Sequence, residues 1–140
     1  LLVTIANKVA KDMNMKYYLK YHPSDSPHLY DHITDNDYYI GAYDKTKTIK
    51  QYAGDVDFSL IANSTVYMEL VFLKHTCYRL CSDKSSLDKY KDVGIMNFSS
   101  AEHVVSLIKK GKGNSAELYD QLCTIEDVRS SYKSFFERYL

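Results

Sequence analysis

One stretch of this sequence sets a strand, a polar turn and a helix in direct succession. Residues 58–62 form an apolar run of strand length, and residues 66–73 carry apolar side chains at helical spacing. The polar turn between them consists of Asn63, Ser64 and Thr65. A helix that follows a buried strand at once is typical of the crossover between parallel strands, so this stretch favours an α/β fold.

The same alternation covers the rest of the chain. Helical patterns occupy residues 1–13, 27–33, 46–52, 64–73 and 101–110, and strand patterns occupy residues 16–21, 38–41, 58–62, 76–80 and 94–98. Two more helical patterns follow over residues 115–123 and 124–139. Asn14, Gly54 and Gly111 are expected to stop the helices that precede them. Together these patterns predict a Rossmann-like α/β fold, with a mostly parallel sheet and helices on both faces.

The composition indicates one domain without an overall charge. The chain has 140 residues, of which 45% are hydrophobic, enough for a single core. Lys and Arg together number 18, as do Asp and Glu, so no nucleic-acid partner is expected. Cys77, Cys81 and Cys123 form neither an even disulfide framework nor a CxxC pair, which predicts reduced thiols in a cytoplasmic protein. No run approaches the roughly 18 apolar residues of a spanning helix, so no transmembrane segment is expected.

The first residue already belongs to a helical pattern. Leu1, Ile5 and Val9 share its apolar face. We therefore expect residues 1–140 to be a single domain cut from a larger, two-domain enzyme. The apolar stripe of residues 115–140 is expected to pack on this domain or across to the other half of that enzyme.

Ligands of open parallel sheets collect in a crevice beyond the carboxyl ends of the strands. Three predicted loops meet at this edge: the loop at His22, residues 42–45 and residues 63–65. The first amides of the helix after the third loop lack intrahelical partners. With the hydroxyl groups of Ser64 and Thr65, they favour a bound phosphate.

Each of these residues also has an explanation that needs no ligand. His22 can donate to a phosphate, or it can be a strand-end histidine bonded to a nearby carbonyl group, and Pro23 keeps the backbone extended in both cases. Ser64 and Thr65 are ordinary helix N-cap residues. With Asn63 they also match a glycosylation sequon, which would require a secreted chain.

Charged and aromatic residues near this edge have two interpretations as well. Glu69 follows Thr65 by one helical turn, where a carboxylate can accept from ribose hydroxyl groups or simply face solvent. Tyr43 can contact a base. Lys45, Lys47 and Lys50 can contact a base or a phosphate, although a solvated helix face explains them better.

Several familiar motifs are missing from the sequence. The scattered glycines form neither a Walker loop nor a dinucleotide-binding fingerprint. His28 and His32 have the spacing of an HExxH helix but lack its Glu, and the other histidines have no zinc spacing. No metal site is therefore expected.

Four motifs occur in an order that resembles the carboxyl-terminal half of GT-B glycosyltransferases, above all bacterial enzymes that build surface polysaccharides. They are His22-Pro23 after a strand, residues 55–65 ending in the Ser-Thr pair, the helix bearing Glu69, and the strand of residues 75–80. The His-Pro and Ser-Thr pairs are similar to those of bacterial sialyltransferases and of glycerophosphotransferases that use CDP-glycerol. The resemblance covers residues 1–110. The Gly-Lys-Pro usual in the family is replaced by Lys74-His75-Thr76.

This resemblance implies a domain that binds a nucleotide-activated donor linked to CMP, CDP or UDP, without a metal or other cofactor. The implied contacts are His22 at the donor phosphate or as an acid, Pro23, Asn63, Ser64 and Thr65 beside it, Glu69 at the ribose, and Gly41, Ala42 and Tyr43 near the base. The general base and the glycan acceptor site would belong to the amino-terminal domain. The chain alone is therefore expected to be inactive.

The implied function is donor binding for a glycosyltransferase of capsule, lipooligosaccharide or other surface-glycan synthesis. The expected location is the cytoplasm, with peripheral association of the full enzyme at the inner face of the plasma membrane left open. Two alternatives remain: an α/β domain that binds a nucleotide or a partner without catalysis, and a domain like those of sugar-nucleotide epimerases.

Overall fold

The computed structural model describes residues 1–22, 24–26, 28–62, 66–81, 97–111 and 119. Its helices are α1 (Leu2–Met13), α2 (Asp31–Thr34), α3 (Ile49–Asp55), α4 (Val66–Phe72) and α5 (Ala101–Lys109). Its strands are β1 (Tyr17–Leu19), β2 (Tyr39–Ala42), β3 (Ser59–Ile61), β4 (Cys77–Leu80) and β5 (Asn97–Phe98). The α/β class predicted from the alternation is confirmed. The helical patterns over residues 115–123 and 124–139 lie outside the described residues, apart from position 119.

The described strands form two small parallel sheets. The first pairs β1 with β2, and the second has the order β3-β4-β5. In the second sheet the register sets Leu60 beside Tyr78 and Leu80 beside Phe98. The parallel arrangement agrees with the prediction, and within the described residues the sheet is divided between β1 and β3.

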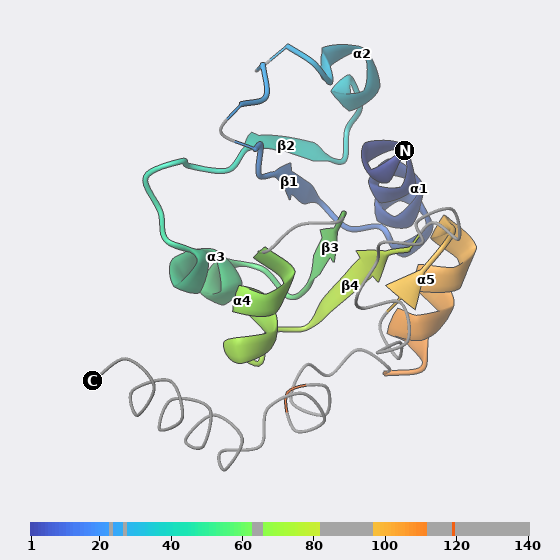
Figure 1. The fold of residues 1–140 in the computed structure, drawn as a ribbon. Helices are drawn as coiled ribbons and strands as arrows, with labels where there is room; N and C mark the ends of the chain where they lie inside the picture. The colour runs from blue at the N-terminus through green and yellow to red at the C-terminus, as the bar shows by residue number, and fades with distance from the viewer. Residues whose placement is uncertain (23, 27, 63–65, 82–96, 112–118, 120–140) are drawn as a thin grey trace.

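Helices cover both faces of the three-stranded sheet. Figure 1 shows α1 and α5 on one side of β3 and β4, with α3 and α4 on the other. Neighbouring residues of a strand point to opposite faces. Tyr78 accordingly packs in the cluster of α1 and α5, whereas Cys77 packs in the cluster of α4.

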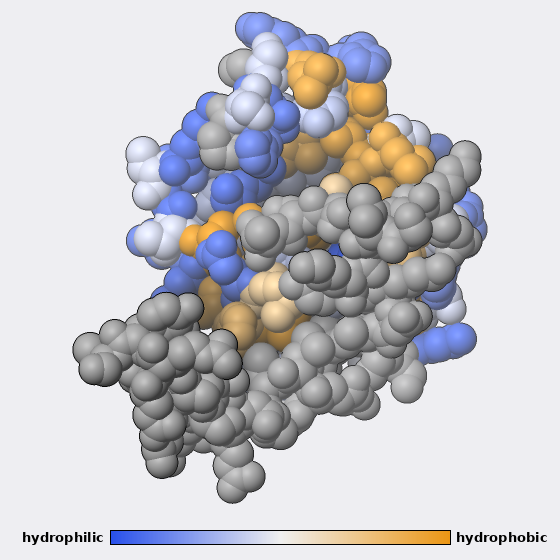
Figure 2. All heavy atoms as spheres, in the orientation of Figure 1, coloured by the Kyte–Doolittle hydropathy of each residue, from blue (hydrophilic) through white to orange (hydrophobic). Residues whose placement is uncertain are grey.

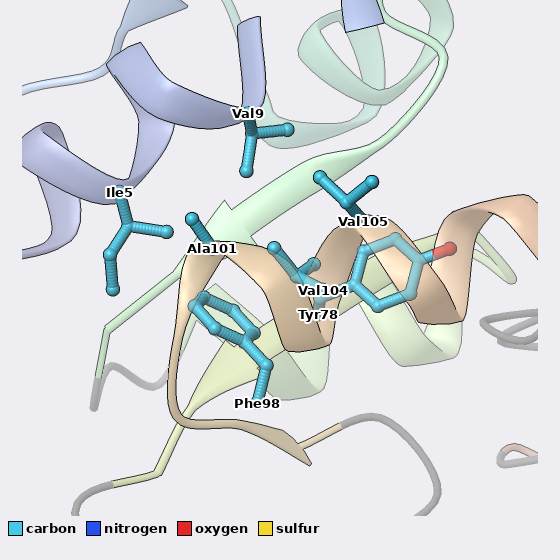
Figure 3. Close-up of a cluster of buried hydrophobic side chains, with 7 residues drawn as sticks. All are labelled: Ile5, Val9, Tyr78, Phe98, Ala101, Val104 and Val105. Atoms are coloured by element: carbon cyan, nitrogen blue, oxygen red, sulfur yellow. The ribbon is translucent and has the colours of Figure 1, made fainter. Parts of the chain in front are cut away.

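The cluster on the α1 side forms the larger core. Figure 3 shows Ile5 and Val9 pointing from α1 toward α5, where Ala101 and Val105 meet them. Val104 of α5 is fully buried beneath them. Burial of an aliphatic side chain of this kind contributes about 1.5 to 3 kcal/mol, so the α1–α5 contact fixes one wall of the molecule.

A polar network fastens the two-stranded sheet to α1. The hydroxyl group of Tyr17 in β1 donates to the side-chain oxygen of Asn7 in α1. The side-chain amide of Asn36, just before β2, donates to the same oxygen at 2.9 Å, and the amide of Asn7 donates to the Ile33 carbonyl at 2.7 Å. These bonds link α1 to β1, to α2 and to the segment between α2 and β2.

The ends of the helices follow local side-chain chemistry. Asn14 adopts a left-handed conformation (φ 52°) and stops α1, as predicted. Ser100 caps α5 by accepting from the His103 amide at 3.2 Å, and Gly111 follows the helix at φ 62°.

The prediction for α3 was wrong at both ends. Thr48 and Gln51 form a capping box, so the helix begins at Ile49 rather than at residue 46. Gly54 lies inside the helix instead of ending it. The helix α2 also begins later than predicted, at Asp31.

Within the ranges that the structure describes, no helix is both long and apolar enough to cross a membrane.

Candidate functional site: a crevice where the chain order reverses

The strand order changes direction at the gap between β1 and β3. On one side of the gap β2 lies outside β1. On the other side β4 lies outside β3, and β5 lies outside β4 (Figure 1). Such a reversal creates a crevice at the carboxyl ends of the strands, because the two flanking connections leave in opposite directions. The structure has a hollow of about 420 Å³ at this edge. We call it the crevice.

The crevice takes residues from several parts of the fold. The loop after β1 contributes His22 and Asp25, and the end of β3 contributes Ala62. Leu1 lines it from the amino end of α1. On the face shown in Figure 2, hydrophobic side chains gather beside this end of α1 and beside α2. The crevice therefore combines an apolar wall with a polar loop.

The turn after β1 holds His22 in a defined arrangement. The His22 amide donates to the Asp25 carboxylate at 3.1 Å, and the Asp25 amide donates to the His22 carbonyl at 2.9 Å. The His22 ring nitrogen Nδ1 lies 2.7 Å from the Ser24 hydroxyl and accepts from the Ser24 amide at 3.2 Å. When Nδ1 accepts, Nε2 carries the proton and is free to donate to an anion.

Two tyrosines stand beside this turn. The rings of Tyr21 and Tyr30 are stacked, with centroids 5.8 Å apart and planes inclined at 24°, and both line the crevice. The Tyr21 hydroxyl lies 3.2 Å from that of Tyr39 in β2. Burial raises the pKa of Tyr39 above that of an exposed tyrosine, and the hydrogen bond to Tyr21 raises it further.

The structure places the predicted base-contacting residues away from the crevice. Gly41 and Ala42 belong to β2 and are not among the residues that line the hollow. Tyr43 is buried, and its hydroxyl donates to the Asp55 carboxylate at 2.6 Å. Its ring meets the edge of Tyr52 with centroids 4.8 Å apart. Tyr43 therefore anchors the segment before α3 to that helix.

The remaining predicted residues divide into two groups. Glu69 is exposed on α4 and does not line the crevice, although Val66 of the same helix does. Pro23, Asn63, Ser64 and Thr65 lie outside the described residues, so the phosphate contacts predicted for them stay predictions. Of the predicted site residues that the structure describes, only His22 lines the crevice.

A buried polar cluster lies at the inner end of the crevice. The Ser59 Oγ atom is 3.0 Å from Nε2 of His75 and 3.3 Å from the Tyr52 hydroxyl. Ser59 and Tyr52 both line the crevice. This cluster was not predicted from the sequence, although a serine inside a predicted apolar strand and a histidine directly before the next strand were signals for it.

A second residue that was not predicted from the sequence is a buried arginine in β4, the middle strand of the three-stranded sheet. Arg79 in β4 is 1% exposed, and its Nε donates to the Asn97 side chain of β5 at 3.0 Å. Its guanidinium lies 5.7 Å from the centre of the Tyr67 ring. Burial raises the pKa of Tyr67 to about 12. The guanidinium thus sits beneath α4 against a neutral ring.

No protein family model, curated protein or solved structure matches this chain. Among the residues that the structure describes, no group of three or more His, Cys, Asp or Glu side chains could hold a metal ion. The fold and the crevice define an α/β protein with parallel strands and a ligand-sized hollow where the chain order reverses.

Proposed function

We propose that this chain is the donor-binding domain of a glycosyltransferase and holds the nucleotide of an activated sugar or alditol in the crevice. One observation carries the proposal: the crevice opens at the carboxyl ends of β1 and β3, where the chain order reverses. Nucleotides bind at this position in open parallel sheets. The order of motifs in the sequence, from the His-Pro pair to the helix with Glu69, supports a glycosyltransferase as the class of enzyme.

The described residues offer groups for two parts of such a ligand. Nε2 of His22 can donate to a phosphate oxygen, and a hydrogen bond to a charged group is stronger than one between neutral groups. The Tyr21 and Tyr30 rings provide aromatic surface on which a base can stack. Leu1 and Leu2 add apolar surface to the lining of the crevice.

The proposed role of this domain is to hold the donor, while the transfer step requires an acceptor and a general base from a second domain. In that step the acceptor hydroxyl attacks the anomeric carbon or the alditol phosphate, its proton passes to the base, and the nucleotide phosphate leaves. A hydrogen bond from His22 would stabilise the charge on the leaving group. The proposed products are bacterial surface glycans.

Isothermal titration of the chain tests this proposal. CMP, CDP, UDP and their sugar or glycerol conjugates are titrated separately, with cytidine and uridine as controls that lack the phosphate. We expect saturable heat with one nucleotide series, with a dissociation constant on the order of 0.1 mM, and much weaker binding of the matching nucleoside. Absence of saturable heat with every nucleotide would overturn the proposal.

A further inference from the structure

The facing edges of β1 and β3 carry backbone groups that the described structure does not pair. In β1 the Tyr17 amide donates to the Tyr38 carbonyl and the Leu19 carbonyl accepts from the Tyr43 amide, so both residues turn their backbone groups toward β2. Backbone groups alternate in direction along a strand. The N–H and C=O groups of Tyr18 therefore point away from β2, toward β3.

The same alternation applies on the other side. The Ser59 amide donates to the Thr76 carbonyl at 3.0 Å, which turns Ser59 toward β4. Leu60, the next residue, directs its N–H and C=O groups away from β4, toward β1. Among the described residues, neither Tyr18 nor Leu60 has a strand partner on this side.

Two hollows lie between these edges. Besides the crevice, a second hollow of about 400 Å³ lies between β1 and β3 at their amino ends, where Met15 and Val56 line it. Tyr18 and Leu60 line both hollows. We call the part of this space that lies between β1 and β3 the slot; the crevice continues beyond it to the turn at His22. Two open strand edges that face each other across a hollow can both be satisfied by one further strand between them.

The position of α1 indicates where such a strand would lead. Leu1 lines the crevice at the carboxyl ends of the strands, and from there α1 runs back along the sheet to the start of β1. A parallel strand in the slot would end beside Leu1. It would then form a β-α-β unit with α1 and β1, the usual connection between adjacent parallel strands.

We infer that the slot is the seat of one extended polypeptide strand, parallel to β1 and β3 and continuous with the amino end of α1. This strand joins the two sheets into one, with the order β2-β1-strand-β3-β4-β5. That is the order of a doubly wound nucleotide-binding sheet, in which the central strand comes first in the chain. The inference does not depend on which ligand the crevice binds.

The walls of the slot define the side chains that the strand presents. On the α1 side the wall consists of Leu2, Val3 and Ala6, which favours small or branched apolar residues. On the α3 side it contains the hydroxyl groups of Tyr52 and Ser59, which favour a residue with a hydroxyl group. An alternation of valine and threonine fits both walls.

Backbone amide exchange, measured residue by residue by NMR, tests the inference. One form of the protein is the chain of residues 1–140, and another is extended ahead of Leu1 by a strand of about six alternating valines and threonines and a short glycine turn. A matched control extension has prolines in place of the valines, because proline has no N–H group to donate. The amides of Tyr17 and Ser59, which already have strand partners, report that each form is folded.

In the chain of residues 1–140 the Tyr18 and Leu60 amides are expected to exchange quickly. The valine and threonine extension is expected to slow both by about a hundredfold or more, and the proline extension to leave them fast. Slow exchange of both amides in the unextended chain would overturn the inference, since the edges would then already be paired. So would fast exchange in the extended form, or protection by the same peptide added separately but not when joined to Leu1.

Discussion

Ser59 and His75 are joined inside the protein by a hydrogen bond of 3.0 Å between Oγ and Nε2. Both side chains are buried, and the His75 ring also bonds to the Ala53 backbone. The bond links β3 to the start of β4.

The first prediction concerns the pH dependence of stability. Burial lowers the pKa of His75 below the 6.5 of an exposed histidine, and the bond to Ala53 offsets this only in part. Between the two pKa values the unfolded chain binds more protons than the folded one, so the free energy of unfolding rises with pH. The His75 contribution is fully present above about pH 6.5 and is lost as the pH falls toward the folded pKa.

Urea denaturation at pH 7.5 and pH 5.5, followed by circular dichroism, measures this effect. The difference in unfolding free energy between the natural chain and His75→Gln is expected to shrink at the lower pH. Using the difference removes the contributions of the other titrating groups, which both chains share. A difference that stays constant or grows toward pH 5.5 would contradict the prediction.

The second prediction concerns the serine of the same pair. Ser59→Ala leaves the buried Nε2 of His75 without its hydrogen-bond partner, so we expect a loss of about 1 to 3 kcal/mol in unfolding free energy. The matched control is Ser99→Ala, because Ser99 is exposed and its loss is expected to change stability by less than about 0.5 kcal/mol. Equal effects of the two changes in the same denaturation experiment would show that the buried bond contributes nothing.

The sequence predicted the helices and strands themselves better than how they pair and pack. The α1 helix was predictable because Ile5 and Val9 recur on one face, and that face packs on α5. The true start of α3 was also readable in principle, since Thr48 and Gln51 have the spacing of a capping box. The gap between β1 and β3 had no local signal, because pairing between strands depends on tertiary contacts.

The candidate site was predictable only in part for the same reason. His22 was found because a strand end next to the crevice follows from the parallel topology. Tyr43 also follows a strand, but its hydroxyl bonds to Asp55 of α3, which depends on how α3 packs. Leu1 lines the crevice through the placement of α1, which no pattern near Leu1 reveals.

The third prediction compares two leucines at the end of α4. Leu70 is fully buried in the cluster beneath α4, whereas Leu73 is 40% exposed. Leu70→Ala removes buried surface and leaves a cavity, at an expected cost of about 2 to 5 kcal/mol. Leu73→Ala is expected to cost less than about 1 kcal/mol. Chemical denaturation of both variants checks the ranking, and a larger loss for Leu73→Ala would contradict the described packing.

The fourth prediction concerns the capping box of α3. The Thr48 hydroxyl accepts from the Gln51 amide at 3.2 Å, and the Gln51 side chain accepts from the Thr48 amide at 2.9 Å. Thr48→Ala removes the first bond, at an expected cost of about 0.5 to 2 kcal/mol. Thr48→Ser keeps the hydroxyl group and should recover most of this loss. If the serine and alanine variants unfold at the same denaturant concentration, the cap does not stabilise α3.

The last prediction concerns ligand binding by His22. If Nε2 donates to the donor phosphate, His22→Ala should weaken nucleotide binding by about 1 to 3 kcal/mol, roughly 5-fold to 150-fold. His103→Ala is the matched control, because His103 is also exposed but lies on α5 and does not line the crevice. Titration calorimetry compares both variants with the natural chain, using the nucleotide and its nucleoside. An equal loss of affinity for the nucleoside would show that His22 does not act through the phosphate.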